Sequence, residues 1–198
     1  MPPKPKYTKE EVIQVALDMV REQGIASLTA RDLGARLGTS ARPIFTAFEN
    51  MEEVKTEVIK AASDYFREYS KNFKQYSPAF KQMGMLIVSF ATKEPKLFEL
   101  LFMEKETSAN ATLEVIDKEC IDVIVAENKI SEKQAKALFD QMWIFTFGLS
   151  TFSAMKVYEY TEYEISDMLT KAFIGNLMVA KSSILDIDID KPKKIEKE

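Results

Sequence analysis

Helix-start signals recur along the whole chain, and they limit its possible folds more than any other feature. A Ser, Thr or Asn followed three residues later by a side chain that can return a hydrogen bond marks a helix N-terminus. Such pairs occur at Thr8–Glu11, Thr29–Asp32, Asn50–Glu53, Ser131–Gln134 and Thr161–Glu164. Between them apolar residues repeat with the period of an α-helix, and strand-like alternation is scarce. We therefore predict an all-α fold.

Proline and glycine mark further helix ends. Ser77–Pro78 and Pro95 suit first helical turns, whereas Gly24 and Gly38 suit helix stops. We predict about nine helices, at 8–23, 29–37, 40–47, 51–74, 78–93, 95–104, 108–128, 131–158 and 162–185. A natural division places three short helices in residues 1–50, a helical bundle in 51–185 and a charged tail in 186–198.

Composition excludes several classes of function. The 198 residues include no histidine and one cysteine, Cys120, which excludes Cys/His zinc sites and removes the commonest general base. We find no catalytic constellation and expect no enzyme, no cofactor and no metal. No apolar run approaches the ~20 residues of a membrane span, and the lysine-rich start is followed by no apolar stretch. We expect a folded cytoplasmic protein outside the membrane.

The first three predicted helices form a unit with a glycine turn between the last two. Val12, Ala16 and Val20 make an apolar face on the first helix, and Leu33 and Leu37 face inward from the second. Gly38 suits a left-handed cap, after which Ser40 is expected to cap the third helix. Ile44 and Phe48 then point inward, and the outward positions are Ala41, Arg42, Phe45 and Thr46. A short helix held this way can enter the DNA major groove.

Charge is distributed unevenly. Up to Phe48 the chain has seven basic and five acidic side chains, a net charge of +2, whereas the remainder has 20 basic and 26 acidic side chains, a net charge of −6. A mildly basic N-terminal unit on an acidic body fits local contact with DNA.

The stretch LTARDLGARLGTSARPIFTAFENMEEV resembles the N-terminal domain of TetR-family transcriptional regulators. The family pattern fits Leu28, Thr29, Arg31, Asp32, Leu33, Gly38, Ser40, Ile44, Phe48, Glu52 and Val54. The resemblance implies double-stranded DNA as a partner, with contacts from Thr29, Arg31, Ser40, Ala41, Arg42, Pro43, Phe45, Thr46 and Lys55. Pro43 could touch DNA or only fix the helix start, and each charged residue could be an ordinary surface residue.

Three positions depart from this family pattern. Phe45, Ala47 and Met51 stand where the family has a tyrosine, a histidine and a lysine. Each change removes a hydrogen bond or charge directed at phosphate, and phosphate contacts supply much of non-specific DNA affinity. We expect weaker DNA binding, or binding that depends on the arm residues Lys4, Lys6 and Lys9.

Residues 77–185 contain nine Phe, seven Met and Trp143, a composition that suits either a dense core or an apolar ligand pocket. The candidate pocket residues are Met83, Phe90, Phe98, Phe102, Met142, Trp143, Phe147 and Met155. By the family resemblance, the last two helices are expected to form a homodimer interface.

These features predict a ligand-responsive regulator, in the sense of a repressor that binds a near-palindromic operator as a dimer. A small, largely apolar effector would release it. The main alternative is a helical small-molecule or lipid-binding protein with a degenerate DNA-binding unit, which the changes at Phe45, Ala47 and Met51 favour.

Overall fold

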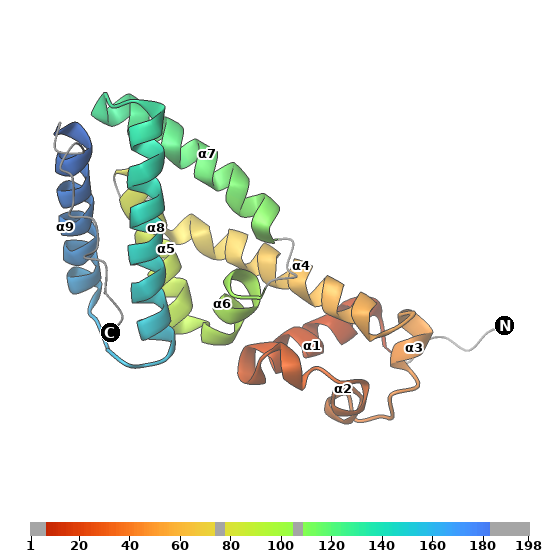
Figure 1. The fold of residues 1–198 in the computed structure, drawn as a ribbon. Helices are drawn as coiled ribbons and strands as arrows, with labels where there is room; N and C mark the ends of the chain where they lie inside the picture. Colours follow the sequence, from red (N-terminus) through yellow and green to blue (C-terminus); the bar gives the residue numbers. More distant parts are fainter. Residues whose placement is uncertain (1–6, 74–77, 105–108, 183–198) are drawn as a thin grey trace, which may run out of the picture.

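The computed structural model describes residues 7–73, 78–104 and 109–182, and these residues form helices without any strand (Figure 1). The all-α prediction is confirmed. The helices are α1 (Lys9–Gln23), α2 (Ala30–Arg36), α3 (Ile44–Ala47), α4 (Met51–Ser70), α5 (Ala79–Lys93), α6 (Pro95–Phe102), α7 (Ala109–Asn128), α8 (Glu132–Ala154) and α9 (Glu162–Lys181). Two short 3₁₀ turns, η1 (Ile25–Ser27) and η2 (Lys71–Phe73), follow α1 and α4.

Most of the predicted helix caps form where the sequence places them. Complete capping boxes join Thr8 to Glu11, Ser131 to Gln134 and Thr161 to Glu164. At α4 the Asn50 side chain accepts from the Glu53 N–H, and Pro95 occupies the first turn of α6. These caps satisfy N–H groups that a helix N-terminus leaves without partners, so local sequence fixes where most helices begin.

Several predicted helix ends are wrong. Pro78 precedes α5 as its cap and is not its first helical residue. The eighth helix ends at Ala154, four residues early, because Lys156 adopts a left-handed φ of 54°. Its N–H and that of Val157 then bond back to Ser153 and Phe152, which closes the helix.

The third helix also differs from its prediction, because Ser40 does not cap it. A capping side chain bonds the second or third N–H of its helix, and Pro43, at the third position, has none. Proline also disfavours the helical backbone conformation for the residue before it, which here is Arg42. The helix therefore covers only Ile44–Ala47, after Pro43.

The helices form an N-terminal unit and a body that share a core (Figure 1). The long α4 runs from the unit of α1–α3 into the body, where α8 and α9 stand side by side. One apolar cluster joins α1–α4 to α6, through residues such as Val20, Val54 and Phe98. A second joins α5 to α7, α8 and α9. Because α5 contributes to both clusters, it connects the two halves.

No described helix is long and apolar enough to cross a bilayer.

Candidate nucleic-acid interface and ligand pockets

The link from α2 to α3 is built by two glycines. Gly38 has a φ of +68°, its N–H bonds the Ala35 carbonyl at 3.0 Å, and the Thr39 N–H bonds the Gly34 carbonyl at 2.9 Å. This pair of bonds closes the helix with a left-handed residue, as the sequence predicts for Gly38. The chain therefore turns sharply before α3.

Gly34 allows the following turn to lie directly against α2. A Cβ atom at this position would lie 2.8 Å from the Ser40 carbonyl carbon and 2.9 Å from the Ala41 nitrogen. Only glycine permits that approach of two backbones. Sequence reasoning missed Gly34, although a glycine inside a helical pattern often has a packing reason. It fixes where α3 begins relative to α2.

Most of the predicted DNA contacts lie on the surface of this unit. Thr29, Arg31, Ser40, Arg42, Phe45 and Thr46 are exposed, whereas Ala41, Pro43 and Lys55 are half-buried. Ile44 and Phe48 are buried beneath them, as predicted. Phe45 is 45% exposed. The exposed candidates in or next to α3 are thus Arg42, Phe45 and Thr46.

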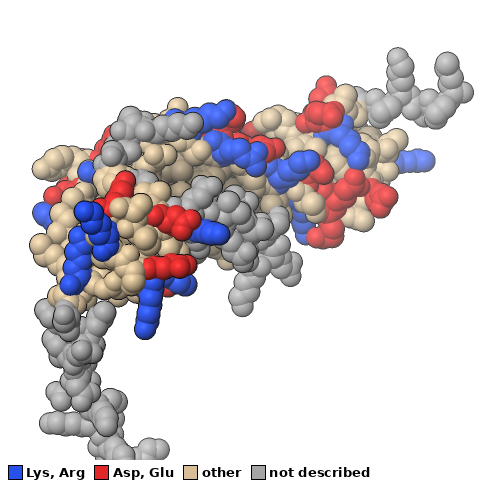
Figure 2. Space-filling view, turned by 90° about the horizontal axis from the view of Figure 1, so that it is seen from above, with Lys and Arg blue, Asp and Glu red and all other residues tan. Residues whose placement is uncertain are grey.

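Two lysines expected to help hold DNA are paired with carboxylates at the start of α4. The Lys9 ammonium lies 2.8 Å from Glu53 and 5.0 Å from the centre of the Phe48 ring, and Lys55 lies 2.8 Å from Glu52. The hydrogen bond from Lys9 lowers the pKa of Glu53, and the same bond raises the pKa of Lys9. Figure 2 shows acidic and basic side chains interleaved over this unit at the right of the view.

Arg31 and Arg42 differ from those lysines, since within the described residues neither forms an ion pair. Thr29 is engaged as the cap of α2: its hydroxyl accepts from the Asp32 N–H at 3.1 Å and donates to the Asp32 carboxylate at 2.6 Å. Lys4 and Lys6 lie outside the described residues. Among the predicted DNA contacts, the described cations without an ion pair are thus Arg31 and Arg42.

A polar cluster joins this unit to the body. Arg21 of α1 pairs with Glu94, the residue between α5 and α6, and its guanidinium lies 4.6 Å from the centre of the Tyr65 ring. The Tyr65 hydroxyl donates to the same Glu94 carboxylate at 2.8 Å. Burial, followed by this hydrogen bond, raises the pKa of Tyr65. The cluster connects α1, α4 and the α5–α6 junction.

The eight predicted pocket residues do not surround one space. Met83, Met142 and Trp143 line a cavity of about 30 Å³ between α5, α7 and α8, which is room for one or two water molecules. Phe90 and Phe98 are completely buried in the core, and Phe102 and Phe147 pack against it. Met155 lies outside this cavity, because it follows the last residue of α8 and is 69% exposed. The role of all eight in binding stays a prediction.

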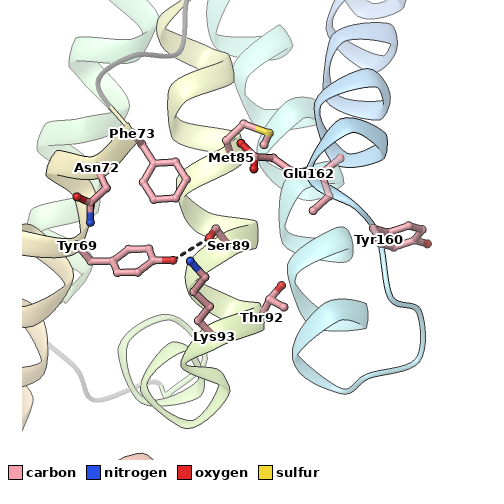
Figure 3. Close-up of a pocket in the computed structure, with 10 residues that line it drawn as sticks. Tyr69, Asn72, Phe73, Met85, Ser89, Thr92, Lys93, Tyr160 and Glu162 are labelled. Atoms are coloured by element: carbon pink, nitrogen blue, oxygen red, sulfur yellow. Dashed lines mark hydrogen bonds between the residues drawn. The ribbon is translucent and has the colours of Figure 1, made fainter.

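A larger pocket opens between α4, α5 and the start of α9 (Figure 3), and sequence reasoning did not find it. Its volume is about 420 Å³, within the range of small-molecule sites. Its walls carry Tyr69 from the end of α4, Phe73 from η2, Ser89 and Lys93 from α5, and Glu162 from α9. No predicted ligand residue lines it.

An exposed apolar surface covers one side of α8 and α9. Ile144 and Phe152 on α8, and Ile174 and Met178 on α9, are all exposed. Gly148 and Gly175 lie on the same helices, and a Cβ at either position would meet no atom within 4 Å. Glycine inside a helix costs about 1 kcal/mol relative to alanine, so neither glycine is explained by the packing of one chain.

Comparison with known proteins identifies the fold. Neither a protein-family model nor a curated protein matches the sequence. Among solved structures, the chain is similar to a TetR variant from Acinetobacter baumannii AYE in complex with minocycline. The identity is 17%, the TM-score is 0.58, and the match covers 89% of this chain and 100% of that one. The chain has a TetR-like fold.

Two further structures share this fold. The fatty acid degradation regulator FadR from Bacillus halodurans matches with 11% identity and a TM-score of 0.58, over 88% of this chain and 97% of that one. The superantigen PfiT matches with 15% identity and a TM-score of 0.54, over 87% and 97%. Because proteins with such different names share the TetR-like fold, the function must be argued from the sites.

Proposed function

We propose that this chain is a transcriptional regulator, acting as a repressor, that binds a near-palindromic DNA site as a homodimer. The observation that carries the proposal is the turn set by Gly34 and Gly38, which holds α3 with Arg42 and Phe45 exposed around it. A short helix held in this way can present its side chains to base edges in the major groove. With this role on DNA, the protein would be located in the cytoplasm.

The exposed surface of α8 and α9 supports a homodimer. Pairing with a second copy would bury Ile144, Ile174 and Met178, which otherwise face water. The two helix glycines, Gly148 and Gly175, would let partner helices approach closely, because neither presents a side chain. A two-fold axis here would place two reading helices in successive major grooves, ~34–36 Å apart.

The effector that we propose is small and largely apolar, and it would enter between α5, α7 and α8. The cavity of about 30 Å³ at Met83, Met142 and Trp143 supports this position. It must widen to hold a ligand, and methionine side chains adapt readily to such changes. Binding would release DNA by favouring a dimer whose reading helices no longer match the groove spacing.

An electrophoretic assay with fragments from upstream of the chain's own gene tests the proposal. The pure dimer should retard one fragment at low salt and release it as salt increases, because phosphate contacts dominate affinity. Absence of retardation at low salt would contradict the proposal. A scrambled fragment of equal length distinguishes specific from non-specific binding.

One observation favours a second candidate, a helical small-molecule or lipid-binding protein with a degenerate DNA-binding unit. The pairing of Lys9 with Glu53 and of Lys55 with Glu52 reduces the positive charge that α1 and α4 offer to DNA. In that case ligand binding would remain while the same assay showed no retardation.

A further inference from the structure

The pocket between α4, α5 and α9 is separate from the cavity assigned to the apolar effector. The two share no lining residue, and they lie on different faces of α5. At about 420 Å³ the pocket has room for a small molecule without any rearrangement. Its lining is also chemically different, because it carries charges and hydroxyls as well as apolar side chains.

One end of the pocket can bind an anion. The Lys93 ammonium lies 5.7 Å from the centre of the Tyr69 ring, and among the described residues it forms no ion pair. Beside it the Tyr69 and Ser89 hydroxyls share a hydrogen bond of 2.8 Å (Figure 3). Only one of the two hydrogens is used in that bond, so the other can be donated to a ligand. An ammonium and a free hydroxyl hydrogen together suit a carboxylate.

The other end of the pocket offers a negative charge. Glu162 is the first residue of α9, so its carboxylate lies at the N-terminal end of that helix. Glu164, not Glu162, closes the capping box with Thr161, and Glu162 takes part in none of the ion pairs of the described residues. Figure 3 shows the Glu162 side chain beside Met85, away from the Lys93 ammonium. An unpaired carboxylate in this position suits a ligand amine.

The lining also includes the apolar side chains of Phe73, Met85 and Ile165. From this arrangement we propose that the pocket binds a small zwitterion with an apolar side chain, of the chemical class of a hydrophobic amino acid. Lys93 and the Tyr69–Ser89 hydroxyl pair bind the carboxylate, Glu162 binds the ammonium, and the apolar lining residues contact the side chain. Thr92 contributes no donor, since its hydroxyl already donates to the Val88 carbonyl at 2.8 Å.

Calorimetric titration of the full-length protein with three matched probes tests this assignment. L-Phenylalanine carries both charges, hydrocinnamate only the carboxylate and phenethylamine only the ammonium. Phenylalanine should bind about tenfold or more tightly than either single-charge probe, because each charged hydrogen bond contributes separately. Lys93→Gln should weaken phenylalanine and hydrocinnamate roughly tenfold and leave phenethylamine unchanged, whereas Glu162→Gln should weaken phenylalanine and phenethylamine and leave hydrocinnamate unchanged.

Lys133→Gln and Glu127→Gln are the charge-matched controls, since both residues are exposed, unpaired in the described structure and absent from the pocket lining. Both controls should bind phenylalanine like the unchanged protein. Lys93 and Glu162 are exposed as well, so unchanged melting curves will show that their variants fold. The assignment fails if no probe binds, or if either pocket variant binds phenylalanine like its control. No DNA is present, so the result is independent of whether the protein is a repressor.

Discussion

Arg21 and Glu94 form an ion pair between α1 and the α5–α6 junction, with the Arg21 Nε 2.9 Å from a carboxylate oxygen of Glu94. The other oxygen of that carboxylate accepts from Tyr65 of α4. Glu94 therefore contacts both α1 of the N-terminal unit and α4, the helix that runs into the body. It is also the neighbour in sequence of Lys93, which lines the large pocket.

Replacing Glu94 by glutamine should destabilise the protein. The amide keeps the size of the side chain and can still accept from Tyr65, but it removes the charge that faces Arg21. The Glu94 side chain is only 13% exposed, so we expect a loss of about 1–2 kcal/mol in the free energy of unfolding. Thermal and urea denaturation measure it.

The control is Glu99→Gln, which removes the exposed Lys96–Glu99 pair on α6. Such a surface pair contributes at most about 0.5–1 kcal/mol. If both variants lose the same amount of stability, the Arg21–Glu94 pair has no special role between α1 and the body.

Gly34→Ala should disturb the N-terminal unit of α1–α3. Because the added Cβ would lie 2.8 Å from the backbone of Ser40, α2 and the following turn must move apart. We expect a loss of roughly 1–3 kcal/mol in unfolding free energy, as for other overpacked sites, together with weaker DNA binding. An unchanged melting temperature would show that the turn yields freely and that Gly34 does not fix α3.

The homodimer is tested by Ile144→Glu. This side chain is 71% exposed in one chain, so a glutamate should change the stability of the monomer by no more than about 0.5 kcal/mol. In a dimer the same carboxylate would be buried without a partner, at a cost of several kcal/mol. Light scattering should therefore give a dimer for the unchanged protein and a monomer for the variant.

Ala126→Glu is the matched control for that variant, since Ala126 is also exposed but lies on α7. It should remain dimeric. If Ile144→Glu is also dimeric at micromolar concentration, the interface lies elsewhere on the molecule.

The free energy of unfolding should be independent of pH near neutrality and should decrease in acid. The chain has no histidine, so no side chain of that type titrates between about pH 6 and 8. Glu53, Glu22 and Glu164 have pKa values below the ordinary 4.5, through hydrogen bonds from Lys9, Arg36 and the Thr161 N–H respectively.

A carboxyl group whose pKa is lower in the folded protein than in the unfolded chain stabilises the fold at any pH above its unfolded pKa. This stabilisation is lost as the pH falls through the pKa of the folded protein. The urea midpoint should thus be constant from about pH 6 to 8 and decrease below 4.5. A midpoint that changes between pH 6 and 8 would indicate a titrating group outside these residues.

Sequence alone predicted those structural features that depend only on residues close together in the chain. The caps at Thr8, Ser131 and Thr161 require only side chains three positions apart, and the left-handed Gly38 requires only its own freedom of φ. Ser40 failed as a cap through an equally local cause, the missing N–H of Pro43. That error was avoidable in principle.

The pockets could not be predicted in the same way, because they depend on tertiary packing. Ser89 and Glu162 meet in one pocket although 72 intervening residues separate them along the sequence. The aromatic and methionine residues that suggested an apolar pocket are those that fill cores most readily, and Phe90 and Phe98 do so completely. Composition therefore indicated a dense interior but not where space remains.

Arg42→Ala tests the proposed DNA-contacting surface around α3 most directly. Arg42 is exposed just before α3 and has no ion pair among the described residues, so removing it should leave folding unchanged. If it contacts a base edge, affinity for the operator should fall by about 1–3 kcal/mol and one position of the site should become degenerate. Arg31→Ala is the comparison: a phosphate contact there would weaken all DNA sequences equally and reduce the salt dependence. Equal operator affinity with and without the Arg42 side chain would remove it from the interface and leave recognition to Phe45 and Thr46.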